Sequence, residues 1–277
     1  MPLRQATNGI NALTDGHQQS RLIGAENVPP LHQFNASGRS PFLLTADHYG
    51  RLIPPALGDL GLPEPELTRH IAWDIGIAGV AERLATLLDA HLIAQRYSRL
   101  VIDCNRPPGA ASSIPVLSEA TTIPGNEALS RDAAEMRRRE VFDPYHHGIA
   151  ALISERLQAQ RPTVLVSLHS FTPVYAGIAR PWHIGALYHR DRILPPLLIK
   201  ALRAEPDLVV GDNEPYAASD QTDYTIPVHG EARGLINTGF EICQDLIEDQ
   251  AGQQQWAERL ARAFGEIEAT LRAQGMI

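Results

Sequence analysis

The chain has 277 residues, of which 44% are hydrophobic and 20% charged, and its formal net charge is −8 at pH 7. This composition is that of an ordinary globular protein, and the length allows one large α/β domain or two small ones. The negative charge, without an uncompensated run of lysine or arginine, argues against nucleic-acid or anionic-membrane partners. No run of 18 apolar residues and no signal-peptide pattern occurs, so we expect a cytoplasmic protein.

Strand and helix patterns alternate along the chain, which predicts an α/β fold with a mostly parallel, partly mixed central sheet flanked by helices. Residues 1–20 are polar and are expected to form a loose leader, whereas residues 21–277 are expected to form a single domain. A hairpin around residues 35–38 is predicted to lead into the first core strand. The predicted strands cover residues 41–46, 91–94, 100–104, 163–169, 182–187, 207–211 and 234–243. The predicted helices lie within residues 69–90, 128–159, 195–204 and 253–273.

Three of these strands end in polar side chains. His48 follows the first core strand, Asn105 and Arg106 follow the strand at 100–104, and His169 ends the strand at 163–169. Ligands bind at the carboxyl ends of strands in open α/β sheets, so we expect these side chains to form one site. Two histidines at such ends favour a zinc site, which needs about three protein ligands and one open position for catalysis.

The third metal ligand is expected within Arg69–Gly76, which contains His70 and Asp74. A spacing of four residues places both on one face if the segment is helical. Asp74 is the better candidate because its neighbours are largely apolar, and an unpaired carboxylate is costly there. A cap or a salt bridge is the alternative explanation for Asp74.

Glu241 is the candidate proton carrier because it lies within the apolar strand at 234–243, where burial raises a carboxyl pKa toward the range of a general base. Arg99 and Arg180 are candidates for polarising a substrate carbonyl. Asn105 and Arg106 are expected to bind a substrate carboxylate, which a guanidinium matches with two parallel hydrogen bonds.

Tyr224 and His229 lie in the polar segment before the Glu241 strand. We expect this segment to close over a bound substrate and to bring both side chains into contact with it.

Several segments resemble the N-formylglutamate amidohydrolase family, which is distantly similar to the zinc carboxypeptidases. They follow the family's order from about residue 40 to residue 248, and the most specific is Ser-Arg-Leu-Val-Ile-Asp-Cys-Asn-Arg-Pro at residues 98–107. The matching segments are Ala46–Pro54, Trp73–Gly76, Tyr97–Pro107, Asp143–His146, Ser167–Phe171 and Phe240–Ile247.

The resemblance implies a phosphorylase/hydrolase-like, zinc-carboxypeptidase-like fold with one zinc ion per chain. It implies hydrolysis of an N-acyl amino acid, most of all N-formyl-L-glutamate to formate and L-glutamate. In that scheme His48 and His169 bind zinc, Asn105 and Arg106 hold the substrate carboxylate, and Glu241 is the general base. Carboxypeptidases supply a glutamate three residues after the first histidine, but Arg51 stands there, so Asp74 takes that place in our prediction.

Another departure is Asp47-His48-Tyr49-Gly50, where the family more often has Pro-His-Ser-Gly. Three alternatives remain open: a carboxypeptidase-like peptidase, a deacylase of another N-acyl substrate, and a metal-free binding protein of the same fold. Arg51 and the altered loop are the features that keep the binding protein open. A homo-oligomer is compatible with the sequence.

Overall fold

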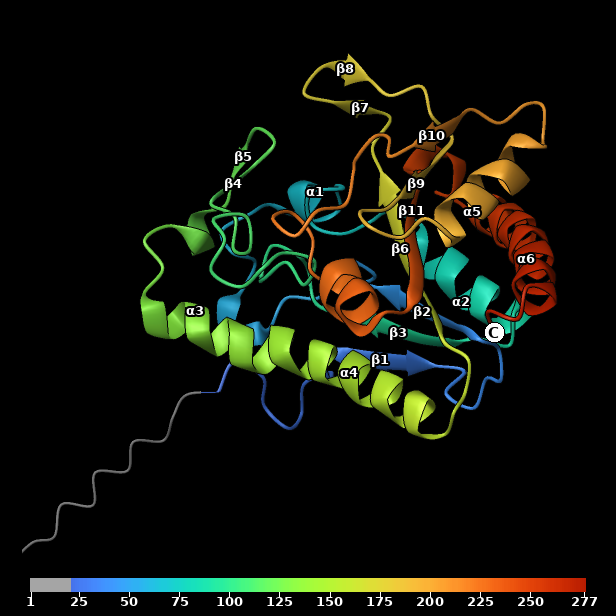
Figure 1. Ribbon diagram of the computed structural model, residues 1–277. Coiled ribbons are helices and arrows are strands. Elements are labelled where there is room, and N and C mark those ends of the chain that lie inside the picture. The colour runs from blue at the N-terminus through green and yellow to red at the C-terminus, as the bar shows by residue number, and fades with distance from the viewer. Residues whose placement is uncertain (1–20) are drawn as a thin grey trace, which may run out of the picture.

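A seven-stranded mixed sheet forms the centre of the protein in a computed structural model that describes residues 21–277 (Figure 1). The predicted leader at residues 1–20 lies outside the described residues. The strands lie side by side in the order β1-β3-β2-β6-β11-β9-β10. Their bounds are β1 Leu31–Phe34, β2 Phe42–Ala46, β3 His91–Gln95, β6 Val164–Phe171, β9 Ile184–Leu187, β10 Val210–Asp212 and β11 Ile236–Cys243.

The four central strands, β3, β2, β6 and β11, are parallel, whereas β1 pairs with β3 and β9 pairs with β11 in antiparallel fashion. Every residue of β2 and β6 is buried. Strands covered on both faces lack the alternation of apolar and polar residues seen in half-exposed strands, which explains their continuous apolar runs. The predicted mostly parallel, partly mixed sheet is confirmed.

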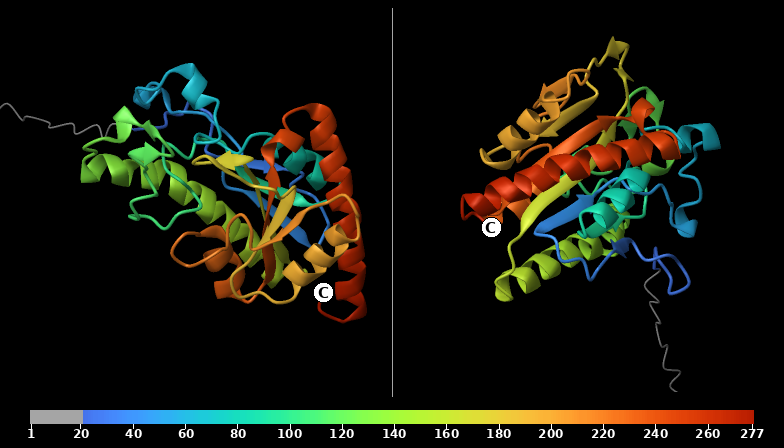
Figure 2. Two further views of the ribbon diagram at one scale, coloured as in Figure 1. Left: turned by 90° about the horizontal axis from the view of Figure 1, so that it is seen from above. Right: turned by 90° about the vertical axis from the view of Figure 1, so that its right-hand side faces the viewer.

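Helices cover both faces of this sheet and complete a single α/β domain (Figure 2). Helices α2, α5 and α6 pack on one face around Leu44, Val166 and Phe240, and α4 packs on the other around Leu43 and Leu165. Consecutive strand residues point to opposite faces, so one strand supplies both cores. The helix bounds are α1 Glu64–Leu67, α2 Ile77–Leu87, α3 Arg131–Arg137, α4 Asp143–Gln158, α5 Leu194–Arg203 and α6 Gln250–Ala273.

The predicted strand at residues 100–104 is wrong, because this segment forms a buried turn. The backbone N–H of Val101 donates to the Ser98 carbonyl, and Leu100 donates to the Ser98 hydroxyl. Leu100, Val101 and Ile102 are nevertheless buried in the core on the α4 side. Their apolar character therefore reflects burial of a turn and not membership of the sheet.

The predicted hairpin at residues 35–38 is also wrong, since β1 pairs with β3 and not with the strand that follows it. The turn instead docks on the segment before β3, where the Asn35 amide donates to Asp89 and to the Ala90 carbonyl. The predicted long helix is present as α3 and α4, joined by a π-helical turn at Arg138–Phe142. This turn ends just before Pro144, whose nitrogen has no hydrogen to donate.

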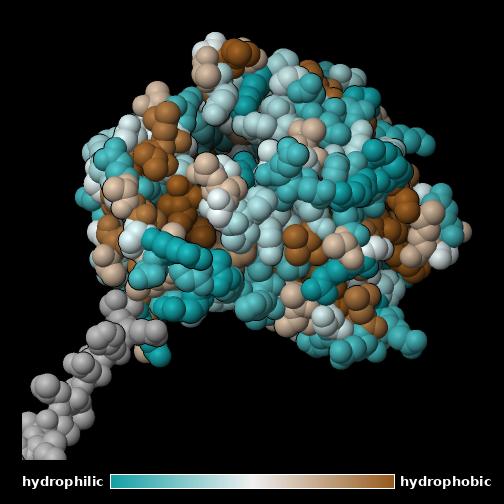
Figure 3. Space-filling model, turned by 60° about the vertical axis from the view of Figure 1, so that its left-hand side comes forward, coloured by the Kyte–Doolittle hydropathy of each residue, from teal (hydrophilic) through white to brown (hydrophobic). Residues whose placement is uncertain are grey.

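Two small hairpins project from the body at the top of Figure 1: β4 Leu117–Ser118 with β5 Thr121–Thr122, and β7 Val174–Tyr175 with β8 Ile178–Ala179. Hydrophobic side chains on the face in Figure 3 occur in groups among hydrophilic ones. Among residues 21–277, no helix has the length and apolar character needed to cross a membrane.

Candidate active site and metal centre

A cavity of about 410 Å³ opens beside the carboxyl ends of β2, β6 and β11. Its wall contains most of the predicted site residues, although they are far apart in the sequence. These are His48, Asp74, Arg99, Asn105, Arg106, His169 and Glu241. We call this space the site cavity below.

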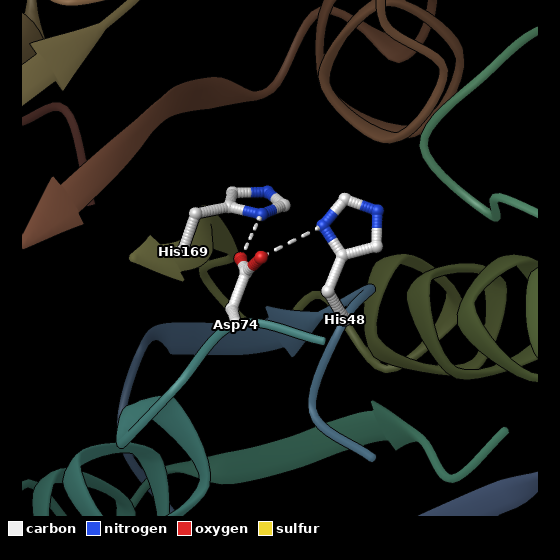
Figure 4. A group of neighbouring side chains, drawn as sticks. All are labelled: His48, Asp74 and His169. Atoms are coloured by element: carbon white, nitrogen blue, oxygen red, sulfur yellow. Dashed lines mark hydrogen bonds and ion pairs between the residues drawn. The ribbon is translucent and has the colours of Figure 1, made fainter. Parts of the chain in front are cut away.

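His48, Asp74 and His169 form a buried group in the wall of the site cavity, with one potential ligand atom from each lying within 4.8 Å of the others. Both imidazoles direct Nδ1 at the Asp74 carboxylate (Figure 4): the distances are 3.4 Å from His48 and 3.0 Å from His169. Asp74 is held by its backbone N–H, which donates to the His48 carbonyl at 3.0 Å. The segment that carries Asp74 is a turn before α2, not the helix considered above.

The Nε2 atom of each histidine faces a second buried carboxylate. His48 Nε2 donates to Asp103 at 2.7 Å. His169 Nε2 lies 3.0 Å from the Ser167 hydroxyl, which donates to Asp47, and 3.3 Å from Asp47 itself. Carboxylates at this position favour the proton on Nε2, so that Nδ1 of a neutral imidazole can act as the metal ligand.

The charges around these two histidines favour a cation. Burial alone lowers the pKa of His169, but hydrogen bonds to Asp47 and Asp74 raise it well above its ordinary value. Burial also opposes ionisation of Asp74, yet His48 and His169 hold its pKa well below the usual range. Three carboxylates, Asp47, Asp74 and Asp103, surround the two imidazoles, and Arg99 pairs with Asp103 and lies near Asp74.

The donor set of two imidazoles and one carboxylate fits zinc. His48 Nδ1 supports this fit directly, because it is buried and has no hydrogen-bond partner among residues 21–277. An unsatisfied buried donor or acceptor is costly, and a metal bond removes that cost. Arg51, the residue at the carboxypeptidase glutamate position, instead forms an exposed ion pair with Glu64 at 2.9 Å.

Glu241 lies beside His169 in the β11–β6 register. Its carboxyl group is buried, and burial raises its pKa to about 7; the charge of His169 opposes the rise and that of Asp74 favours it. Glu241 Oε2 has no hydrogen-bond partner among the described residues. A carboxyl group poised near neutral pH with a free oxygen suits proton transfer.

Arg99 and Asn105 have partners within the protein. Arg99 donates twice to Asp103, at 2.6 and 3.0 Å, and its Nη1 lies 3.6 Å from Asp74. The Asn105 side chain accepts from the backbone of Tyr224 and Thr225 and donates to Asp223. Asn105 therefore holds the 223–225 segment against the cavity wall.

Arg106 donates to the carbonyls of Asn105 and Thr222 and has no ion-pair partner within residues 21–277. Its guanidinium therefore remains available to an anionic ligand in the site cavity, whose wall it helps to form.

The structure places Tyr224 and His229 outside the wall of the site cavity. His229 lies in a π-helical turn, Ile226–Gly230, and its Nε2 is 2.9 Å from Nδ1 of His146. His146 Nε2 donates to the Cys104 carbonyl at 2.8 Å, and the Tyr224 ring packs against both imidazoles. Both predicted substrate contacts thus belong to a buried cluster behind the Asp103–Asn105 turn.

Sequence reasoning did not identify Asp47 and Asp103 as partners of the two histidines. Both lie in the matching segments, but only the fold shows that Asp47 faces His169 and not its neighbour His48.

Comparisons with known proteins identify the family of this chain. The model of the N-formylglutamate amidohydrolase family matches residues 40–248. An N-formylglutamate deformylase of Pseudomonas aeruginosa is 35% identical over 138 residues, which cover 44% of this chain and 48% of that protein. The match therefore spans about half the length of this curated relative.

Solved structures extend the similarity over most of the chain. The crystal structure of a gene product from Agrobacterium tumefaciens has a TM-score of 0.86 at 36% identity, covering 88% of this chain and 97% of that one. An N-formylglutamate amidohydrolase from Ralstonia eutropha JMP134 has a TM-score of 0.66 at 18% identity, covering 89% and 100%. The latter similarity concerns the fold alone.

Proposed function

The chain belongs to the N-formylglutamate amidohydrolase family, and from this premise we propose that it is a zinc-dependent hydrolase of N-formyl-L-glutamate. The products are formate and L-glutamate. The observation that carries the proposal is the orientation of His48 and His169, which both direct Nδ1 at Asp74 beside the free oxygen of Glu241.

His48, Asp74 and His169 are the residues that would hold the zinc ion. When bound, such an ion lowers the pKa of water and polarises a carbonyl oxygen. Asp103 and Asp47 keep the two imidazoles in the orientation that binding requires.

Glu241 carries the proton in this scheme. As a carboxylate it removes a proton from the water that attacks the formyl carbon, and it then delivers that proton to the amide nitrogen as the C–N bond breaks. Its pKa of about 7 allows both roles near neutral pH.

Arginines orient and stabilise the substrate. Arg106 binds a substrate carboxylate, since its guanidinium has no acidic partner among the described residues. Arg99 is already bound to Asp103, so its contribution is the positive charge that it places beside the reacting carbonyl.

The test is formate release from N-formyl-L-glutamate by the purified full chain, together with elemental analysis. We expect about one zinc ion per chain in the wild type, and loss of both zinc and activity in His169→Ala. Glu241→Gln is expected to keep the zinc and to lose activity by about 10²- to 10⁴-fold, the usual contribution of a general base.

Near-full activity of a zinc-loaded Glu241→Gln variant would contradict the proposed proton carrier. A folded wild type that binds no zinc would favour the metal-free binding protein. A screen of N-acyl amino acids against short peptides separates the deformylase from a deacylase of another substrate and from a peptidase.

A further inference from the structure

Arg180 follows the β7–β8 hairpin, and its guanidinium packs against two tyrosine rings. Its central carbon is 4.7 Å from the Tyr175 ring centre and 4.6 Å from that of Tyr216. Nη2 donates to the Tyr216 hydroxyl at 2.6 Å. The two cation–π contacts, together with this hydrogen bond, restrict the orientation of the guanidinium.

This cation has no counter-charge within the part of the chain that the structure describes. No carboxylate oxygen of residues 21–277 lies within 4 Å of Arg180, and Nη1 is shielded from solvent without a hydrogen-bond partner. Partial burial of an unpaired charge with an unsatisfied donor is unfavourable. An anionic ligand that accepts a hydrogen bond from Nη1 would remove that cost.

The rings around Arg180 connect it to the site cavity. Tyr175, Tyr216 and Phe171 all line the cavity together with His169 and Glu241. Arg180 itself is not among the lining residues and lies next to these rings. Of the two arginines in the cavity wall, Arg99 is bound to Asp103, whereas Arg106 has no carboxylate partner among the described residues. Arg106 in the cavity wall and Arg180 next to the Tyr175 and Tyr216 rings are therefore two guanidinium groups without a carboxylate partner among the described residues. They lie 74 positions apart in the chain.

We propose that Arg180 binds the side-chain carboxylate of the substrate while Arg106 binds its α-carboxylate. Arg180 is then the residue that selects N-acyl derivatives of acidic amino acids. A planar guanidinium with a fixed orientation suits two parallel hydrogen bonds to a carboxylate. This inference rests on the proposed function, because it assigns a second carboxylate site around the same reacting amide.

The first test compares N-formyl-L-glutamate with N-formyl-L-glutamine, which has nearly the same shape but no side-chain charge. Arg180→Gln is expected to lower kcat/KM for the glutamate derivative by about 10- to 100-fold, mainly through KM. Hydrolysis of the glutamine derivative is expected to stay at the wild-type rate. Arg180→Lys keeps the charge without the planar fork, so its effect should be intermediate.

Arg192→Gln is the matched control. Arg192 also packs over a tyrosine, Tyr188, at 5.2 Å, but Arg192 is exposed and Tyr188, unlike Tyr175 and Tyr216, does not line the site cavity. Its substitution should leave both substrates unaffected. An equal loss on both substrates in Arg180→Gln would overturn the proposal, since it would indicate a general role in catalysis or folding.

Calorimetric binding of glutarate to the zinc-loaded protein separates this inference from the proposed function. Glutarate carries two carboxylates and no amide, and butyrate is the control with one carboxylate. If the wild type hydrolyses no formyl amino acid yet Arg180→Gln weakens glutarate binding about 10-fold or more, the deformylase function fails and the carboxylate site stands. Unchanged glutarate binding in the variant overturns the site.

Discussion

Two buried carboxylates, Asp103 and Asp47, determine how the imidazoles of the site are oriented. Asp103 faces the Nε2 atom of His48, and Asp47 faces the Nε2 atom of His169. The Nδ1 atom of each imidazole then points toward Asp74. We expect Asp103→Asn and Asp47→Asn each to weaken zinc affinity by about 10- to 100-fold, because an amide cannot supply the negative charge that strengthens a histidine ligand. Competition with a chromogenic chelator measures this directly.

Asp207→Asn is the control for these two substitutions, because Asp207 is exposed and does not line the site cavity. Zinc affinity equal to that of the wild type in Asp103→Asn would show that His48 is positioned by its own packing and not by this carboxylate.

At the scale of single residues, the sequence predicts the polar strand ends but not their mutual orientation. His48, His169 and Glu241 are recognisable because each interrupts or ends an apolar run. The partnership of Asp47 with His169 joins positions more than 100 residues apart, and it depends on the β2–β6 register. Only the folded sheet determines such a contact.

At the scale of elements, Gly76 controls how the Asp74 turn enters α2. Its φ of +79° is in the left-handed region, and a Cβ there would lie 2.1 Å from the Ile247 carbonyl oxygen. We expect Gly76→Ala to lower the free energy of unfolding by about 2–5 kcal/mol, from left-handed strain together with overpacking. Urea unfolding followed by circular dichroism measures this change.

Gly234→Ala provides the comparison, since Gly234 has a φ of +67° and open space around its missing side chain. Gly234→Ala should lower the free energy of unfolding by only about 1–2 kcal/mol, because it introduces left-handed strain without overpacking. Equal costs at the two positions would mean that the Ile247 backbone moves away freely, and that the Asp74 turn is not constrained by this contact.

Elements with uniform burial could be predicted well, and buried turns could not. The apolar runs of β6 and β11 predict strands correctly because both belong to the centre of the sheet. Residues 100–104 show the same kind of run, yet Ser98 turns the chain before any ladder forms. Hydrophobic periodicity reports burial, and a short run does not distinguish a strand from a turn that is buried equally deeply.

At the scale of the whole molecule, the fold buries three histidines away from the site cavity. Burial lowers the pKa of His91 to about 4, of His146 to about 4 and of His229 to about 3. All three are neutral in the folded protein at neutral pH, whereas in the unfolded chain they bind protons below about pH 6.5. The unfolded state thus gains protons first on acidification, and the free energy of unfolding falls as pH drops below about 6.5.

His229→Gln isolates one of these contributions, because a glutamine amide can still donate from the position of Nε2 to His146. We expect the variant to be no more stable than the wild type at pH 8. As the pH falls from about 6.5 to 4, the free energy of unfolding of the variant should rise relative to that of the wild type by about 1.4 kcal/mol per pH unit. The reason is that the variant lacks one group that takes up a proton on unfolding. Urea unfolding at pH 8, 6 and 5 gives this difference, and parallel pH profiles would mean that His229 is protonated in the folded state as readily as in the unfolded chain.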